Sequence, residues 1–176
     1  SVALFIPKSC TPFQWDGQIS LEEIQHRIQV LRDSFPRKGI DLRWHDSETS
    51  YVEAVLARGG RDCAALVEQA WKNGARFDAW TEQFNADAWW QAGDACGVPI
   101  MQRAVCAYEE GAPLPWDHIS CGVSERFLLS EREKARMATT TPDCTFGPCS
   151  PCGVCMDLHV RNVLEAKRVA MGANHE

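Results

Sequence analysis

The chain has 176 residues, of which 45% are hydrophobic, and a formal net charge of −6. This length is enough for one buried core with a small appendage. The acidic net charge argues against broad electrostatic binding to nucleic acid, which needs clustered lysine and arginine. An acidic chain can still contain a local basic patch. No run of about 18 apolar residues occurs, and the N-terminal SVALFIPK has no basic leader, so we expect a cytoplasmic protein without a membrane span.

The first expected element is a strand over residues 2–6. Val2-Ala3-Leu4-Phe5-Ile6 is a continuous apolar run that ends at Pro7, which is typical of a strand buried on both faces. A buried strand needs neighbours. We therefore expect the rest of its sheet to come from upstream in a longer polypeptide or from a partner subunit.

Helices are expected to dominate the middle of the chain. Ser20 with Glu23 and Ser50 with Glu53 each form a capping box, and Pro36 ends the apolar helical period that follows the first box. Between the two boxes, apolar residues alternate with polar ones over residues 40–44, as in a half-buried strand. Further helices are expected over residues 62–73, 86–95, 100–109 and 124–137, and a last amphipathic helix after residue 155.

Residues 138–155 have a different composition. Gly, Pro and Cys replace the periodic apolar residues, so this segment cannot bury an apolar face, and a bound metal centre is the best candidate to hold it in place. The cysteines follow the spacing C-x4-C-x2-C-x2-C and are Cys144, Cys149, Cys152 and Cys155. Iron-sulfur clusters commonly take four thiolates from such closely spaced runs. A [4Fe-4S] cluster is therefore favoured over zinc, whose ribbons usually separate two CxxC pairs by a dozen or more residues.

The chain has nine cysteines, and the other five are less informative. Cys63 and Cys106 fall within expected helices and Cys96 at a helix end, so all three are interpreted as small buried side chains. Cys10 and Cys121 lie in loops, where either could be an extra ligand or have no ligand role.

Several motifs together resemble the C-terminal part of an uncharacterised bacterial family of radical SAM proteins. They are Phe5-Ile6-Pro7-Lys8 with Thr11-Pro12-Phe13-Gln14-Trp15, Leu56-Ala57-Arg58-Gly59 with Ala70-Trp71 and Gly74 to Trp80, Leu114-Pro115-Trp116-Asp117-His118-Ile119, and Thr141 through Cys155. The resemblance covers nearly the whole chain up to Cys155.

This resemblance implies a mainly α fold with a few short strands, divided into four parts. Residues 1–19 would end the radical SAM barrel, 20–137 would form a helical extension, 138–157 a Cys-rich iron-sulfur loop, and 158–176 a tail. SAM, and possibly cobalamin, would bind only in an upstream part, because the chain contains no CxxxCxxC for a SAM-cleaving cluster. The sequence also departs from the family pattern at Ser9-Cys10 and at Gly60.

Other residues have both functional and structural interpretations. His45, Asp46 and Glu48 could form an active-site loop, but Asp46 or Ser47 as a helix cap is favoured. Trp116, Asp117 and His118 are interpreted as a rigid connector with Asp117 forming a turn. Core packing is favoured for the tryptophans of the helical middle, Trp71, Trp80, Trp89 and Trp90, with at least one of Trp89 and Trp90 facing a partner. Lys8 and Arg58 could contact an anion or form ion pairs.

Two functions follow from these patterns. The first is the C-terminal part of a radical SAM enzyme with an auxiliary cluster, whose four cysteine ligands favour electron relay or a structural role over substrate binding. The second is a zinc-stabilised module that contacts a protein or RNA without catalysis. The reaction and the catalytic residues stay unassigned.

Overall fold

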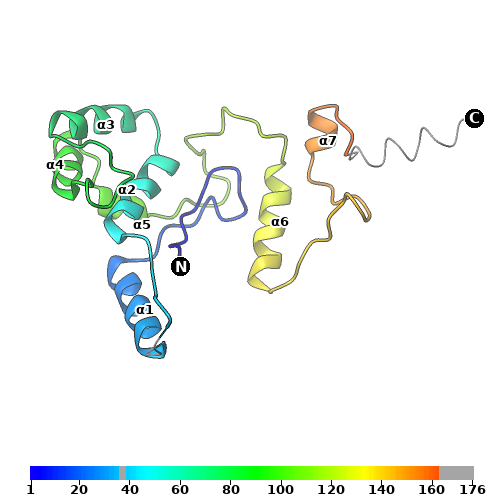
Figure 1. Cartoon of the computed structure of the whole chain (residues 1–176). Helices are drawn as coiled ribbons and strands as arrows, with labels where there is room; N and C mark the ends of the chain where they lie inside the picture. The colour runs from blue at the N-terminus through cyan, green and yellow to red at the C-terminus, as the bar shows by residue number, and fades with distance from the viewer. Residues whose placement is uncertain (36–38, 163–176) are drawn as a thin grey trace, which may run out of the picture. The chain divides into compact units, whose positions relative to one another are not determined.

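The computed structural model describes residues 1–35 and 39–162, and it is mainly helical (Figure 1). No helix in this part of the chain is long and apolar enough to cross a membrane. The chain divides into two compact units, residues 1–9 with 14–118 and residues 10–13 with 119–176. The described helices are α1 (Leu21–Ser34), α2 (Ser47–Arg58), α3 (Asp62–Lys72), α4 (Ala86–Cys96), α5 (Ile100–Val105), α6 (Glu125–Arg136) and α7 (Val154–Asp157).

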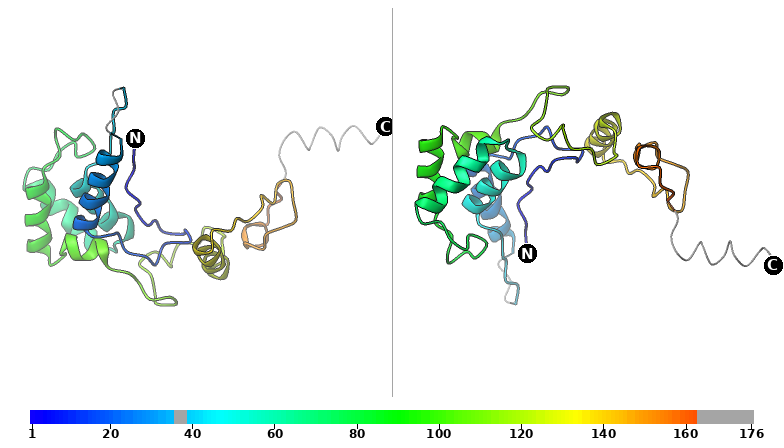
Figure 2. Two further views of the ribbon diagram at one scale, coloured as in Figure 1. Left: turned by 90° about the horizontal axis from the view of Figure 1, so that it is seen from below. Right: turned by 90° about the horizontal axis from the view of Figure 1, so that it is seen from above.

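The first unit has its core among α2, α3, α4 and α5. Helix α3 packs against α4, and α2 packs against α5 (Figure 2). Leu66, Ala70, Ala92 and Ala104 are completely buried there. Because alanine has a small side chain, the helices can pack closely at these positions. Larger side chains such as Tyr51 fill the remaining volume of the core.

Local capping sets the start of three helices. Ser20 caps α1, Asn85 caps α4 and Ser124 caps α6, and each side chain accepts the backbone N–H three residues on. The predicted starts near residues 20 and 124 are therefore confirmed. The Glu23 side chain does not complete the predicted capping box, because it pairs with Arg27 instead.

The second predicted capping box is wrong. Helix α2 begins at Ser47, one turn earlier than predicted, and the Asp46 side chain accepts the Thr49 N–H at 2.9 Å. Glu53 instead forms an ion pair with Lys8. Asp46 is the helix cap, as the sequence also indicated, because its carboxylate accepts a free amide of the first turn.

The predicted strands are largely absent from the described residues. A single parallel bridge joins Val2 to Trp44, and Phe5 is 63% exposed, so the expectation of burial on both faces is wrong. Leu4 and Ile6 pack against the core while Phe5 faces outward, which is the alternation of a half-buried strand.

One helix prediction needs correction, and another lies mostly outside the described residues. The helix expected over residues 100–109 ends at Val105. Helix α7 covers only Val154–Asp157, and most of the predicted last helix, from residue 163 onward, lies outside the described residues.

Candidate metal centre

The second unit contains the four cysteines of the predicted site. Cys144, Cys149, Cys152 and Cys155 all carry free thiols; Cys149 is exposed and the other three are half-buried. Between residues 141 and 162 no residue is fully buried. The segment therefore gains little from apolar packing, as its composition predicts, and depends on local hydrogen bonds.

The start of this segment is held on the side of α6. The Lys134 ammonium donates to Glu131 at 2.8 Å and to the Thr141 hydroxyl at 2.9 Å, and that hydroxyl donates to Glu131 at 2.6 Å. The hydrogen bond from Lys134, followed by that from Thr141, lowers the pKa of the Glu131 carboxyl below its ordinary value. The three side chains form a closed set of charge-assisted hydrogen bonds.

The turn that carries the last two cysteines, Cys152 and Cys155, is held at the N-terminus of α6. The Ser124 backbone N–H donates to the Cys152 carbonyl at 2.7 Å. Gly153 follows with φ of 104°, and a Cβ there would lie 2.9 Å from the Gly122 carbonyl oxygen. Gly122, with φ of 79°, would carry a Cβ 3.1 Å from Leu158. Only glycine at positions 122 and 153 allows this approach without strain.

The Cys144 thiol has a polar neighbour that the sequence did not indicate. The Asn162 side-chain amide donates to Cys144 Sγ at 3.1 Å and also lies within hydrogen-bond distance of the Thr145 hydroxyl. N–H groups directed at a ligand sulfur are the kind of contact that tunes a metal centre.

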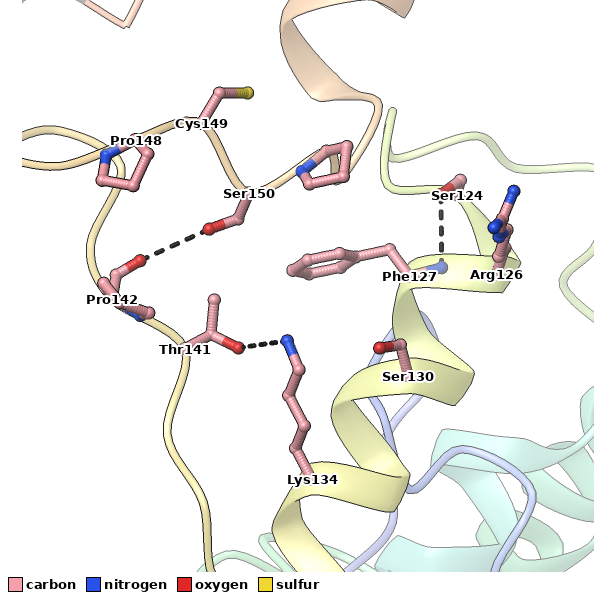
Figure 3. Close-up of a pocket in the computed structure, with 11 residues that line it drawn as sticks. Ser124, Arg126, Phe127, Ser130, Lys134, Thr141, Pro142, Pro148, Cys149 and Ser150 are labelled. Atoms are coloured by element: carbon pink, nitrogen blue, oxygen red, sulfur yellow. Dashed lines mark hydrogen bonds between the residues drawn. The ribbon is translucent and has the colours of Figure 1, made fainter.

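A cavity of about 510 Å³ separates α6 from the cysteine-rich segment (Figure 3). Arg126, Phe127 and Lys134 line its helical side, and the Phe127 ring points into it. The Cys149 sulfur points away from Lys134 and Thr141 (Figure 3). The cavity wall therefore contains cations, hydroxyls and one aromatic ring, while the thiol faces the other side of the segment.

The donor set suits a thiolate-ligated metal, because four free thiols lie within one turn-rich segment. In the part of the chain that the structure describes, no three Cys, His, Asp or Glu side chains are gathered closely enough to hold an ion. The segment would have to close for the four sulfurs to converge. Its exposed, sparsely packed backbone presents little apolar contact that would oppose such closure.

The remaining cysteines divide between the two units. Cys10 and Cys121 belong to the same unit as the cysteine-rich segment; Cys10 is half-buried and Cys121 is exposed. Cys63 is buried as predicted, and burial raises the pKa of its thiol. The prediction for Cys106 is wrong, because α5 ends before it and leaves the side chain exposed.

Two of the structural interpretations are confirmed by hydrogen bonds. The Asp117 carboxylate accepts the Leu114 N–H at 2.7 Å and forms the predicted turn. Trp116 is buried and donates to the Gln14 side chain at 2.9 Å.

Arg58 forms no ion pair among the described residues. It is 3% exposed, donates to the Cys106 carbonyl at 3.0 Å, and stacks over the Tyr108 ring at 4.8 Å. Burial lowers the pKa of its guanidinium. Arg58 therefore joins α2 to the segment after α5.

The tryptophans of the helical middle differ from one another. Trp89 is buried as predicted, and Trp90 is partly buried against the core. Trp71 and Trp80 are 54% and 59% exposed, so core packing is wrong for both. Trp71 stacks under Arg76, and Trp80 stacks on Phe77.

Sequence reasoning missed several residues around the cysteines. Lys134, Glu131 and Thr141 act together across a helix end, and Asn162 lies beyond the last cysteine. One signal was available, because Cys-Gly-Val occurs three times, at residues 96–98, 121–123 and 152–154. The structure brings the second and third of these together, because Ser124, which follows residues 121–123, donates to the Cys152 carbonyl.

In comparisons with family models, curated proteins and solved structures, the chain has no match. The proposed function therefore depends on the residues themselves and on the resemblance noted from the sequence.

Proposed function

We propose that Cys144, Cys149, Cys152 and Cys155 bind a [4Fe-4S] cluster, and that the chain is the C-terminal part of a cytoplasmic radical SAM enzyme. One observation carries the metal proposal. All four thiols are free in a segment that has no fully buried residue between positions 141 and 162. Metal binding can supply the folding free energy that such a segment does not obtain from apolar burial.

The surrounding residues would position the ligands. The bonds among Lys134, Glu131 and Thr141 hold the start of the segment, and the Ser124 N–H holds Cys152. Asn162 would donate to the Cys144 thiolate in the closed segment as it does here. A cluster with four thiolate ligands supplies electron transfer or structural support.

The upstream radical SAM domain, in the same polypeptide or as a separate subunit, is the proposed partner. SAM, and possibly cobalamin, would bind in that domain, since this chain lacks CxxxCxxC. The extended residues 2–6 support this proposal, because their alternating exposure is that of a strand with one face turned outward.

The competing proposal is a zinc-stabilised module that contacts a protein or RNA. Four free thiols also suit structural zinc, and the exposed Trp71 and Trp80 are of the residue type enriched at interfaces. The acidic net charge of −6 favours a protein partner over RNA.

Metal analysis after anaerobic purification separates these proposals. We expect iron and sulfide with broad visible absorption, and loss of both in single variants of the four cysteines to serine. Cys106→Ser is the matched control, because Cys106 is exposed and belongs to the other unit. A colourless protein loaded with zinc would support the module instead. If the four variants kept wild-type metal content and thermal melting, both metal proposals would fail.

A further inference from the structure

The cavity between α6 and the cysteine-rich segment has a lining that suits one class of small ligand. Its volume of about 510 Å³ lies within the range of small-molecule sites, and all of its lining residues belong to the second unit. Two of them are cations, Arg126 and Lys134, and none is an aspartate or a glutamate. In a chain with a net charge of −6, such a lining favours a negatively charged ligand.

The polar groups of the lining offer more donors than acceptors. Lys134 donates to Glu131 and Thr141, which leaves one N–H of its ammonium group unused. Among the described residues the Ser130 hydroxyl makes no hydrogen bond, and its oxygen is directed from α6 toward the opposite segment (Figure 3). The Ser124 oxygen accepts a backbone N–H of α6, so its own O–H can still donate. A ligand for these groups must therefore supply several acceptor oxygens.

The same wall carries an aromatic ring. The Phe127 ring points into the cavity, and three prolines add apolar surface to the lining. Phe127, Ser130 and Lys134 are spaced by three and four residues, so they share one face of α6. The helix rise places the first and the last of them about 10 Å apart along the axis, with the hydroxyl between them. The order of groups along the wall is thus ring, hydroxyl and cation.

We propose that this cavity binds a nucleoside monophosphate. The planar base would stack on the Phe127 ring, the sugar hydroxyls would lie beside Ser130, and the phosphate would accept the unused N–H of Lys134. Arg126 supplies a second positive charge in the lining, which matches the second negative charge of a phosphate monoester. An inorganic anion would leave the ring unused, and a purely apolar ligand would leave the donors unused.

The proposed ligand site goes beyond the metal centre and does not depend on it. The groups that would contact the nucleotide belong to α6, and none of the four proposed metal ligands is among them. Cys149 lines the cavity, but its sulfur points away from Lys134 and Thr141 (Figure 3). Metal content and nucleotide binding are therefore separate measurements, and the failure of either proposal leaves the other intact.

Titration of the isotope-labelled full chain with adenosine monophosphate, followed by NMR, tests this proposal. We expect the amide signals of Ser130 and Thr141 to shift, while those of α3 in the first unit stay unchanged. Adenosine lacks the phosphate, and ribose phosphate lacks the base. Each should bind at least about tenfold more weakly than the nucleotide, because each loses one of the two principal contacts. Monophosphates of other bases should bind within about tenfold of it, since aromatic stacking tolerates every base.

Two variants separate recognition of the phosphate from a structural role. Lys134→Gln and Glu131→Gln both disturb the hydrogen bonds that hold Thr141, but only the first removes the cation. Lys134→Gln should therefore weaken binding of adenosine monophosphate about tenfold. Glu131→Gln should leave the affinity unchanged or raise it, because it removes the carboxylate that competes for the ammonium group.

Phe127→Leu tests recognition of the base. It should weaken binding of adenosine monophosphate about tenfold and leave the weaker binding of ribose phosphate unchanged, because only the nucleotide has a ring to stack. Phe77→Leu is the matched control, because Phe77 is exposed, belongs to the first unit and should affect neither ligand.

Three results would overturn the proposal. The first is that adenosine monophosphate does not bind at millimolar concentrations. The second is that ribose phosphate or inorganic phosphate binds as tightly as the nucleotide, which would show that only the anion is recognised. The third is that Lys134→Gln and Glu131→Gln weaken binding equally, which would show that these side chains only hold the segment in place.

Discussion

Replacing Gly153 by alanine tests how the turn that carries Cys152 and Cys155 is held on α6. Gly153 has φ of 104°, and Gly74, at the end of α3, has φ of 103°. Either replacement places a side chain in the left-handed region, at a cost of about 1–2 kcal/mol. Only at Gly153 does the new Cβ meet a backbone atom, the Gly122 oxygen at 2.9 Å, whereas Gly74 has nothing within 4 Å. The difference between the two variants therefore measures the effect of the contact, because both variants share the conformational strain.

Relief of that contact requires the Cys152–Gly153 turn to move away from α6. The movement would break the Ser124 N–H to Cys152 hydrogen bond, which has a net value of about 1 kcal/mol. The expected total for Gly153→Ala is thus about 2–3 kcal/mol, against about 1–2 kcal/mol for Gly74→Ala.

Amide hydrogen exchange followed by NMR gives the local readout. We expect the Ser124 amide to exchange several-fold faster in Gly153→Ala, by up to about tenfold, because 1 kcal/mol changes an opening equilibrium by about fivefold and 1.4 kcal/mol by tenfold. In Gly74→Ala the Ser124 rate should match wild type. The reasoning is refuted if Ser124 keeps its wild-type exchange rate in Gly153→Ala while urea unfolding shows equal losses in both variants.

Three further predictions concern charge and burial. The lowered pKa of Glu131 means that its bonds stabilise the folded state above the ordinary carboxyl value of 4.5 and are lost as pH falls below it, so Glu131→Gln should flatten the acid side of a plot of melting temperature against pH. Arg58→Met should cost about 1–3 kcal/mol in urea unfolding, because the buried Arg58 side chain loses its hydrogen bond to the Cys106 carbonyl and its stacking on Tyr108, while the exposed Arg61→Met should stay within about 0.5 kcal/mol. Iodoacetamide at neutral pH should modify exposed Cys106 well before Cys63, whose burial raises its pKa; equal rates by mass spectrometry would contradict the burial.

Helix positions were predictable where the deciding interactions are local. Ser124 caps α6 through an amide three residues away, and Gly74 ends α3 in the conformation that its residue type favours. The error at α2 arose where a distant residue competed. Glu53 fits a capping box with Ser50, but Lys8, which pairs with it, is far away in the sequence. A short motif does not contain that information.

Burial was less predictable than helicity, because it depends on tertiary neighbours. An apolar run such as residues 2–6 does not show whether one or both faces will be covered, and here Phe5 faces outward. Trp71 and Trp80 have large, mainly apolar side chains, which are typical of core residues. Both lie exposed and stack on residues of the turn after Gly74: Trp71 on Arg76, and Trp80 on Phe77, which adopts φ of 56°.

The cysteine-rich segment was recognisable from the spacing of its cysteines, but its contact with the start of α6 was not. The Cys-Gly-Val tripeptides at residues 121–123 and 152–154 each place glycine at positive φ before a helix, and a hydrogen bond joins Ser124, directly after the first of them, to Cys152 in the other. Helix α6 thus fixes the carbonyl of Cys152 before any ligand binds, and α7 begins directly after Gly153. Cys144 and Cys149 precede this fixed point, in a stretch held mainly by turn hydrogen bonds. Closure on a metal would therefore move Cys144 and Cys149 toward Cys152 and Cys155, because the Cys152 carbonyl is already hydrogen-bonded to Ser124 at the start of α6.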